Sequence, residues 1–234
     1  MAGVAGVRSQ PLLGMISIII TLGYRAALAR LEQSSPTGLI HALMDDEESL
    51  ENAAYASYRH ANGFDKLVLA SSPGGPSVKM DVWWPEDTRG QEDIHNHRYS
   101  FCSRLLTGEL SIEHHELRDD GVPMNHFNIE IVGRRTDRLN DCGQQRVEKR
   151  FEASIAAGTT YWLHHQQLHR VVAAPNVLSA TLVCQDANAR DTSDIFRPVG
   201  SSRPERRYNA PFEPAELKDR LNRLLGELER PRSG

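Results

Sequence analysis

Two histidines separated by a single residue, His95 and His97, are the side chains of this sequence that most directly indicate chemistry. On an extended strand, alternate side chains point to the same face, so both imidazole rings can approach one point. Neutral imidazole is the commonest protein ligand for a transition metal. We therefore expect a metal site on a strand that continues through Phe101 and Leu105 and ends at the turn residue Gly108.

A third histidine, His169, lies eleven residues after Gly158, near the start of another predicted strand. A pair such as His95 and His97 is also typical of polar alternation on a strand surface, but a third histidine at this spacing favours a metal site. The two segments resemble the two motifs of the cupin superfamily, and the resemblance extends over Lys66–Gln185. It implies a mainly β fold, a double-stranded β-helix of the jelly-roll type, in which the three histidines bind one metal ion.

One ligand that most cupins have is missing from this chain. A glutamate usually follows the histidine pair, but here the candidate positions hold Phe101 and Cys102, and no glutamate occurs between His97 and Gly108. Three neutral ligands leave the charge of a divalent ion uncompensated and leave positions open for an anionic substrate and dioxygen. In this respect the chain resembles the cysteine dioxygenase-like group of thiol dioxygenases. The resemblance implies Fe(II), with zinc, nickel or manganese as alternatives because imidazoles accept all of these ions.

Two residues near the predicted ligands are candidates for a catalytic role. Cys102 follows His97 by five residues, as in the animal enzymes of that group, although in a regular strand its side chain faces away from the metal. His165 precedes the third histidine and could act as an acid or base, as could its neighbour His164, unless both lie at the surface. The sequence leaves these roles open.

The substrate-binding residues are predicted from their positions around the ligands. The arginine that holds the substrate carboxylate in the resembled group lies just before the barrel, where this chain has Tyr58 and Arg59. The group's tyrosine after the third histidine is absent, so the resemblance implies oxygenation of a small anionic molecule, with a thiol as one instance, rather than of cysteine itself. The predicted substrate-binding set is Tyr58, Arg59, Tyr99, Phe101 and Tyr161.

Two other functions remain open at this point. A non-redox metal-dependent cupin, such as an isomerase, lyase or hydrolase, would use the same histidines around a different ion. A metal-free, ligand-binding cupin would need no ion at all. Nucleic acid is not an expected partner, since the net charge is −4 and no basic stripe or helix-turn-helix is evident. The expected partners are a small-molecule substrate and dioxygen, with a homodimer suggested by the cupin resemblance alone.

Amino-acid composition and cysteine spacing indicate the class of protein and its cellular compartment. With 234 residues, 39% hydrophobic and 25% charged, the chain has the composition of an ordinary globular protein. Its cysteines, Cys102, Cys142 and Cys184, are scattered and form no C-x-x-C pair, which favours free thiols and a cytoplasmic location. The short apolar run Pro11–Leu22 is predicted to belong to a packed amphipathic helix, with a signal peptide as the alternative.

The elements that must position these residues fall into three predicted parts: a helical extension over 1–63, the β-barrel with the metal site over 64–188, and an extension with a helix over 189–234. Ser35 and one of the two residues Asp45 and Asp46 are expected to cap helices. Polar loops are expected over 85–93 and 133–145. The predicted helices are 15–31, 36–44, 47–60 and 214–228, and the predicted strands are 66–71, 77–84, 94–108, 110–117, 127–132, 147–153, 159–165, 168–173 and 177–185.

Overall fold

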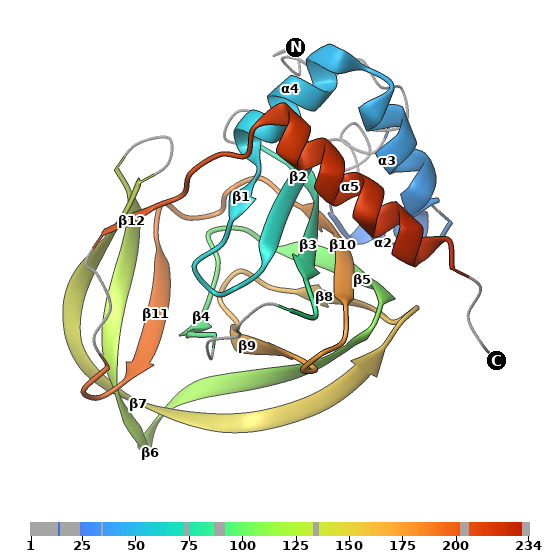
Figure 1. Cartoon of the computed structure of the whole chain (residues 1–234). Helices are drawn as coiled ribbons and strands as arrows, with labels where there is room; N and C mark the ends of the chain where they lie inside the picture. The colour runs from blue at the N-terminus through green and yellow to red at the C-terminus, as the bar shows by residue number, and fades with distance from the viewer. Residues whose placement is uncertain are drawn as a thin grey trace.

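Two antiparallel six-stranded sheets form the body of the protein, seen in a computed structural model that describes residues 14, 24–33, 35–72, 75–86, 92–132, 136–201 and 206–230 (Figure 1). The first sheet has the order β1 (Tyr58–Arg59), β2 (Asp65–Ser71), β3 (Ser77–Trp83), β10 (Ser179–Gln185), β5 (Phe101–Thr107) and β8 (Thr160–Leu163). The second has the order β11 (Ser193–Pro198), β4 (Ile94–His95), β9 (Leu168–Ala173), β6 (Glu109–Ile131), β7 (Thr136–Ala156) and β12 (Arg206–Tyr208). The predicted mainly β jelly-roll fold is confirmed.

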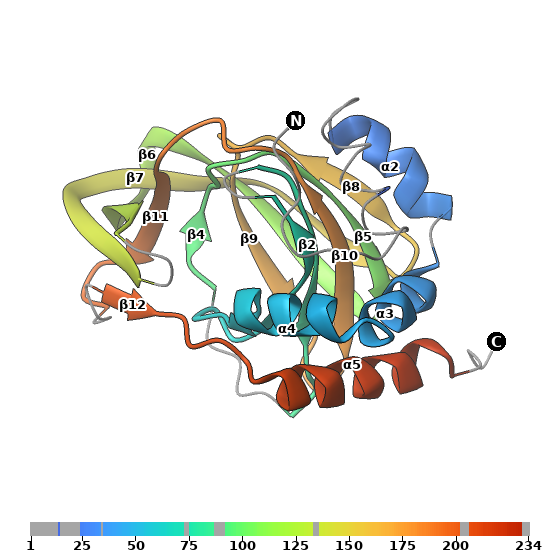
Figure 2. The same cartoon turned by 90° about the horizontal axis from the view of Figure 1, so that it is seen from above.

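Helices cover the outer face of the first sheet. Viewed from above, α3 (Pro36–Met44), α4 (Glu47–Ala56) and α5 (Pro214–Leu228) lie across the face formed by β2, β3 and β10, and α2 (Tyr24–Gln33) lies near β5 and β8 (Figure 2). Ser35 caps α3 by accepting a hydrogen bond from the Gly38 amide at 3.1 Å, and Asp46 caps α4, as predicted. The first turn of α4 carries two acidic residues, which suit the positive end of the helix dipole.

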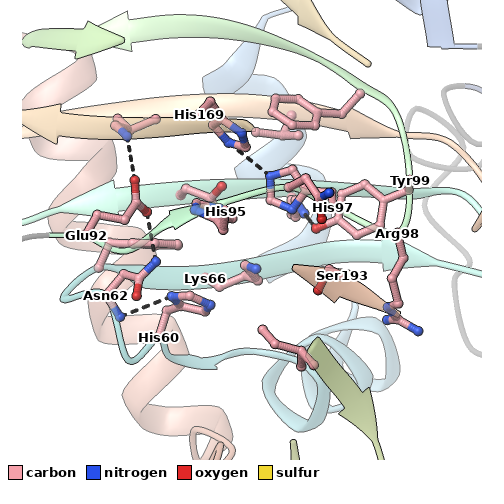
Figure 3. A pocket seen from close by; sticks show the side chains of 18 of the residues that line it. His60, Asn62, Lys66, Glu92, His95, His97, Arg98, Tyr99, His169 and Ser193 are labelled. Carbon is pink, nitrogen blue, oxygen red and sulfur yellow. Dashed lines mark hydrogen bonds between the residues drawn. The ribbon is translucent and has the colours of Figure 1, made fainter. Parts of the chain in front are cut away.

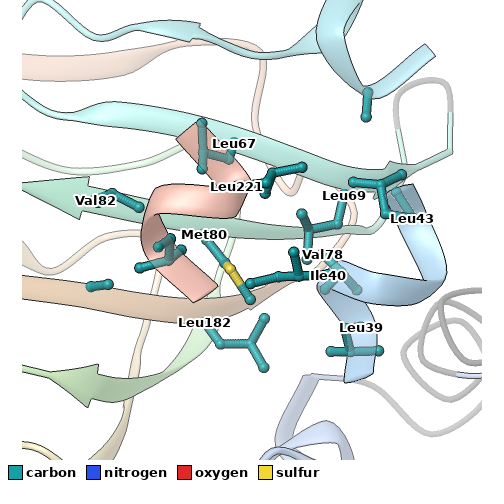
Figure 4. Close-up of a cluster of buried hydrophobic side chains, with 14 of the residues drawn as sticks. Leu39, Ile40, Leu43, Leu67, Leu69, Val78, Met80, Val82, Leu182 and Leu221 are labelled. Atoms are coloured by element: carbon teal, nitrogen blue, oxygen red, sulfur yellow. The ribbon is translucent and has the colours of Figure 1, made fainter. Parts of the chain in front are cut away.

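The hydrophobic core fills the space between these helices and the sheet (Figure 4). Val78, Met80 and Val82 alternate along β3 toward the helices, and each is fully buried. Leu221 of α5 and Ile40 of α3 pack against them. The alternation predicted for residues 77–84 is therefore present, and its apolar face is the one under the helices.

Several predicted boundaries are wrong, and most of these errors concern pairing over long distances. Residues 136–145, predicted as loop, belong to β7, which pairs with β6 along a hairpin whose strands have 23 and 21 residues. Strands β11 and β12 were not predicted, because their pairing partners, not their own composition, define them. The helix predicted over 47–60 ends at Ala56. Part of the helix predicted over 15–31 lies outside the described residues, and α2 starts at Tyr24.

Candidate metal centre

The three predicted ligands converge between the two sheets (Figure 3). His95 and His169 are directly paired across β4 and β9, so their side chains point to the same face of the second sheet. One ring nitrogen from each of His95, His97 and His169 lies within 4.8 Å of the others. The Nε2 atoms of His97 and His169 are 3.2 Å apart. Two nitrogens bound to one ion at about 2.1 Å are roughly 3.0–3.4 Å apart, so this separation fits a shared metal ion.

The hydrogen bonds of two histidines set which nitrogen is free to bind. Nδ1 of His95 lies 2.9 Å from the carbonyl oxygen of Asp93, and Nδ1 of His169 lies 3.2 Å from that of Gln167. A carbonyl oxygen only accepts, so each Nδ1 carries the proton and each Nε2 keeps its lone pair for a ligand. The two rings are thus fixed in the tautomer and orientation that a metal site needs.

His97 reaches the cluster from a loop, since the strand predicted over 94–108 is interrupted. β4 ends at His95, residues 96–100 are irregular, and β5 begins at Phe101. The loop is held by Asn96, whose Nδ2 donates to Asp194 Oδ2 at 2.8 Å while the Asp194 amide donates back to Asn96 Oδ1 at 2.7 Å. The His97 amide also donates to the His165 carbonyl oxygen at 3.2 Å. His97 is therefore positioned by hydrogen bonds of the loop backbone and of the Asn96 side chain, and not by a regular strand shared with His95.

Burial favours the uncharged form of His97 and His169. Burial lowers the pKa of His97 well below its usual value, and the nearby positive charge of a protonated His169 or His95, and of Lys79, would lower it further. The pKa of His169, which is 3% exposed, is lowered for the same main reason. Neutral imidazoles are the form that binds a metal ion. The ring of His97 also stacks on that of Tyr99, with centroids 5.0 Å apart and planes 15° apart.

A cavity of about 170 Å³ adjoins the three histidines. Its wall opposite the second sheet is formed by inward side chains of the first sheet, the face away from the helices. Four of the five predicted substrate-binding residues line it, namely Tyr58, Tyr99, Phe101 and Tyr161. Arg59 is engaged elsewhere, donating to Asp65 Oδ1 at 3.0 Å and to the Gly63 carbonyl oxygen at 2.9 Å.

The two candidate catalytic residues lie outside this cavity lining. Cys102 is fully buried in the core between the first sheet and the helices, and its cross-strand partner is Cys184. β5 stays regular at this point, so the side chain faces away from the histidines. His165 forms a hydrogen-bonded pair with Ser100, and its backbone, not its ring, contacts His97. The ring of the exposed His164 lies 4.1 Å from that of His165.

Six charged residues line the cavity, and none of them was predicted from the sequence as a site residue. Lys66, Lys79 and Asp81 are on the inner face of β2 and β3, and Glu92 precedes β4. The alternation along β3 already placed Lys79 and Asp81 on one face. The missing information was that helices cover the other face, which makes the charged face the interior one.

Glu92 connects three segments around the site. Its Oε1 accepts a hydrogen bond from Asn62 Nδ2 at 3.0 Å, and its Oε2 accepts one from the Val171 amide at 2.6 Å. Burial raises the pKa of this carboxyl group, although a positive charge on His95 and the two hydrogen bonds oppose the shift. A buried carboxyl group of this kind can exchange a proton at a pH closer to neutral than an exposed one.

Comparisons with known proteins assign no family and no activity to this chain. No family model and no curated protein matches the chain. Among solved structures, an oxalate decarboxylase variant of Bacillus subtilis has a TM-score of 0.33 at 12% identity, covering 56% of this chain and 27% of that one. An RmlC-like cupin of Shewanella frigidimarina has a TM-score of 0.32 at 15% identity, covering 58% and 86%. A hydroquinone 1,2-dioxygenase of Sphingomonas sp. TTNP3 has a TM-score of 0.33 at 10% identity, covering 53% and 66%.

The chain spans only about a quarter of the length of the decarboxylase that it matches. None of the helices in the described part of the chain is long and apolar enough to cross a membrane.

Proposed function

We propose that this protein is a mononuclear non-heme iron cupin dioxygenase that oxygenates a small anionic molecule. The observation that carries the proposal is the ligand set: three histidines, with no carboxylate in the cluster that the described residues form. Such a set leaves an Fe(II) ion with net positive charge and open positions, which suits an anionic donor and dioxygen. Iron held by His95, His97 and His169 would supply the redox chemistry with dioxygen that the reaction requires.

The protein's own residues would then bind, orient and enclose the substrate. Phe101 and Trp83 provide apolar wall beside the polar side chains of the cavity. Phe101 contacts His97 edge-on, with ring centroids 5.2 Å apart and planes 77° apart, and so limits the water around that ligand. The cavity is large enough for a small metabolite and too small for a polymer. A thiol is one substrate that this chemistry accommodates.

Metal content and oxygen consumption test the proposal together. The purified chain should contain close to one iron per chain when it is expressed in iron-replete medium, measured by plasma mass spectrometry. Oxygen-electrode assays over small thiols and small acids should find a substrate that consumes dioxygen. A chain that binds no transition metal, or one whose turnover is unchanged by strict anaerobic conditions, would contradict the proposal.

A second function, non-redox metal catalysis, is favoured by Glu92. Its buried carboxyl group has a raised pKa and lies in the same cavity as the three histidines. An isomerase, lyase or hydrolase needs a proton carrier of this kind beside its metal ion. Turnover without oxygen, lost in Glu92→Gln but retained with zinc in place of iron, would support this function over the first.

The cellular setting is also a proposal. All three cysteines are free thiols, and two of them, Cys102 and Cys184, are buried side by side without forming a disulfide. Free thiols are typical of a reducing compartment, which supports the cytoplasm. A homodimer is proposed only from the cupin resemblance, and size-exclusion chromatography with light scattering would test it.

A further inference from the structure

The inner face of the first sheet carries an ordered polar surface opposite the histidines. Tyr58, Lys66, Asp81 and Thr181 are consecutive cross-strand partners on β1, β2, β3 and β10. All four line the cavity, as does Lys79, two residues before Asp81. Burying such groups costs free energy unless they are hydrogen-bonded or paired. On the helix side the same strands bury mainly apolar side chains, and the buried carboxylate there, Asp65, is paired with Arg59 and with Arg220 of α5.

The two ammonium groups lie close to the metal ligands and are held mainly by aromatic side chains. Lys79 donates to Tyr99 Oη and to Gln185 Oε1, both at 3.0 Å. The Nζ atom of Lys66 lies 5.6 Å from the ring centroid of Tyr58, and Figure 3 shows this lysine near His95 and His97. None of these hydrogen bonds or ring contacts is with a carboxylate, although Asp81 is the cross-strand neighbour of Lys66. Each ammonium group has three N–H donors and so retains capacity to bind an anion.

Burial alone would lower the pKa of Lys66, but the neighbouring Tyr58, Tyr99 and Asp81 raise it above its usual range. Lys66 therefore stays charged. The Nζ atom of Lys79 lies 4.7 Å from the ring centroid of Tyr99, and both lysines line this region of the cavity. That region adjoins His97, whose ring stacks on Tyr99.

The charges of the cavity wall indicate how many negative charges a ligand should bring. The wall contains three basic and three acidic side chains, whose charges balance when all six are ionised: Lys66, Lys79 and Arg98 against Asp81, Glu92 and Asp137. A divalent ion on the three histidines adds two positive charges. A ligand with two negative charges would restore the balance, one group near the ion and the other near the two lysines.

The described part of the cavity wall also contains a hydrogen-bond acceptor without a donor. Oδ1 of Asp81 is buried and has no hydrogen-bond partner among the described residues. Leaving a buried carboxylate oxygen unpaired costs free energy, so a ligand that donates to it gains affinity. A hydroxyl or ammonium group on the ligand would provide that donor.

We propose that the substrate of this site is a small dianion whose second acidic group is a carboxylate bound by Lys66 and Lys79, and that Asp81 accepts a hydrogen bond from a hydroxyl or amino group next to that carboxylate. This inference rests on the proposed function, because it assigns the first anionic group to the ion held by the histidines.

Binding of simple acids to the zinc-loaded, full-length chain tests the inference without oxygen chemistry. Titration calorimetry should rank malate above succinate and succinate above butyrate, because these probes offer two carboxylates with a hydroxyl, two carboxylates, and one carboxylate. Lys66→Met and Lys79→Met should each weaken succinate binding about tenfold and leave butyrate unchanged. Asp81→Ala should remove the advantage of malate over succinate.

Controls separate the lysine site from general charge effects and from folding. Lys149→Met removes the same charge from an exposed position outside the cavity and should bind succinate like the parent chain. The zinc content of each variant shows whether its histidine cluster is intact. If one lysine variant fails to fold, the other still tests the inference. Equal binding of succinate and butyrate by the parent chain, or unchanged succinate binding in both folded lysine variants, would overturn the inference.

Failure of the dianion site and failure of the dioxygenase proposal would give different experimental results. If the iron-loaded chain consumes no dioxygen with any dianion but the zinc-loaded chain keeps the binding order, the dioxygenase proposal fails and the dianion site stands. If oxygen is consumed with a neutral or singly charged substrate and the lysine variants retain KM, the dianion site fails and the dioxygenase proposal stands.

Discussion

The two faces of the first sheet contrast sharply although they belong to the same strands. On β3, Val78, Met80 and Val82 face the helices and form the core, whereas Lys79 and Asp81 face the cavity. On β10, Leu182 is in the core and Thr181 in the cavity wall. Strand alternation thus assigns stability to one face and ligand chemistry to the other, without separate segments for each.

This contrast shows that the helices contribute to function indirectly. Packing of α3, α4 and α5 removes the outer face from water, so the sheet can be stable while the part of its inner face that lines the cavity carries polar side chains. Apolar side chains such as Leu105 and Leu110 fill another part of the space between the sheets. Substitutions on the two faces should therefore separate folding from metal and ligand binding.

The largest expected effect is on the histidine cluster. His169→Ala removes one of the three predicted metal ligands, and we expect the metal affinity to fall at least 100-fold, so that nearly all bound metal is lost. The loss should exceed the 10–100-fold decrease in affinity that is typical when only a hydrogen-bond partner of a metal ligand is removed. Metal per chain after dialysis, measured by plasma mass spectrometry, checks this. His164→Ala at the exposed neighbouring turn is the matched control. Metal retention by His169→Ala would disprove the ligand assignment.

The sequence predicts well those features that depend on nearby residues. The caps Ser35 and Asp46 follow from local hydrogen bonding, and the period of β3 follows from its own alternation. The three histidines follow from their spacing within the resembled motifs. The caps and the strand period can each be predicted from a few neighbouring residues, and the histidines from the two motifs that contain them.

The features that the sequence did not predict depend on distant partners. The loop after His95 is held by Asn96 and Asp194, which are 98 residues apart. β11 exists because Ile195 pairs with His95 and its neighbours pair with β6. Lys66 and Asp81 become cavity residues only because helices cover the opposite face. No local pattern contains this information.

The next largest effect should fall on stability alone. Leu182→Ala leaves a hole in the core on the outer face and should lower the free energy of unfolding by about 2–5 kcal/mol, with metal content unchanged. Thr181→Ala, one residue earlier on the inner face, removes little apolar volume and is its matched comparison. Urea denaturation measures both. A larger loss of stability in Thr181→Ala than in Leu182→Ala would contradict the division of the two faces.

A smaller effect is expected from the loop that carries His97. Asn96→Ala removes both side-chain hydrogen bonds to Asp194, so His97 is held less firmly. We expect a 10–100-fold loss of metal affinity, typical of contacts that orient a ligand, with unfolding free energy changed far less than in Leu182→Ala. Competition with a chelator measures the affinity. Asn125→Ala, at the partly exposed position opposite Gln144, is the amide control.

The smallest effect concerns acid stability at Asp194. Burial raises the pKa of this carboxyl group, but hydrogen bonds from Asn96, His126 and Asn128 and the charge of Arg190 lower it overall. Because the folded pKa is below the unfolded one, near 3.9, the contribution to stability is present above that pH and is lost as pH falls through the folded pKa. Asp194→Asn should therefore lose less stability than the parent chain between pH 5 and pH 2.5. Urea midpoints of metal-free protein at both pH values measure this, with exposed Asp191→Asn as the charge control. Parallel acid profiles for parent and Asp194→Asn would show that the ionised carboxylate contributes nothing to holding the loop.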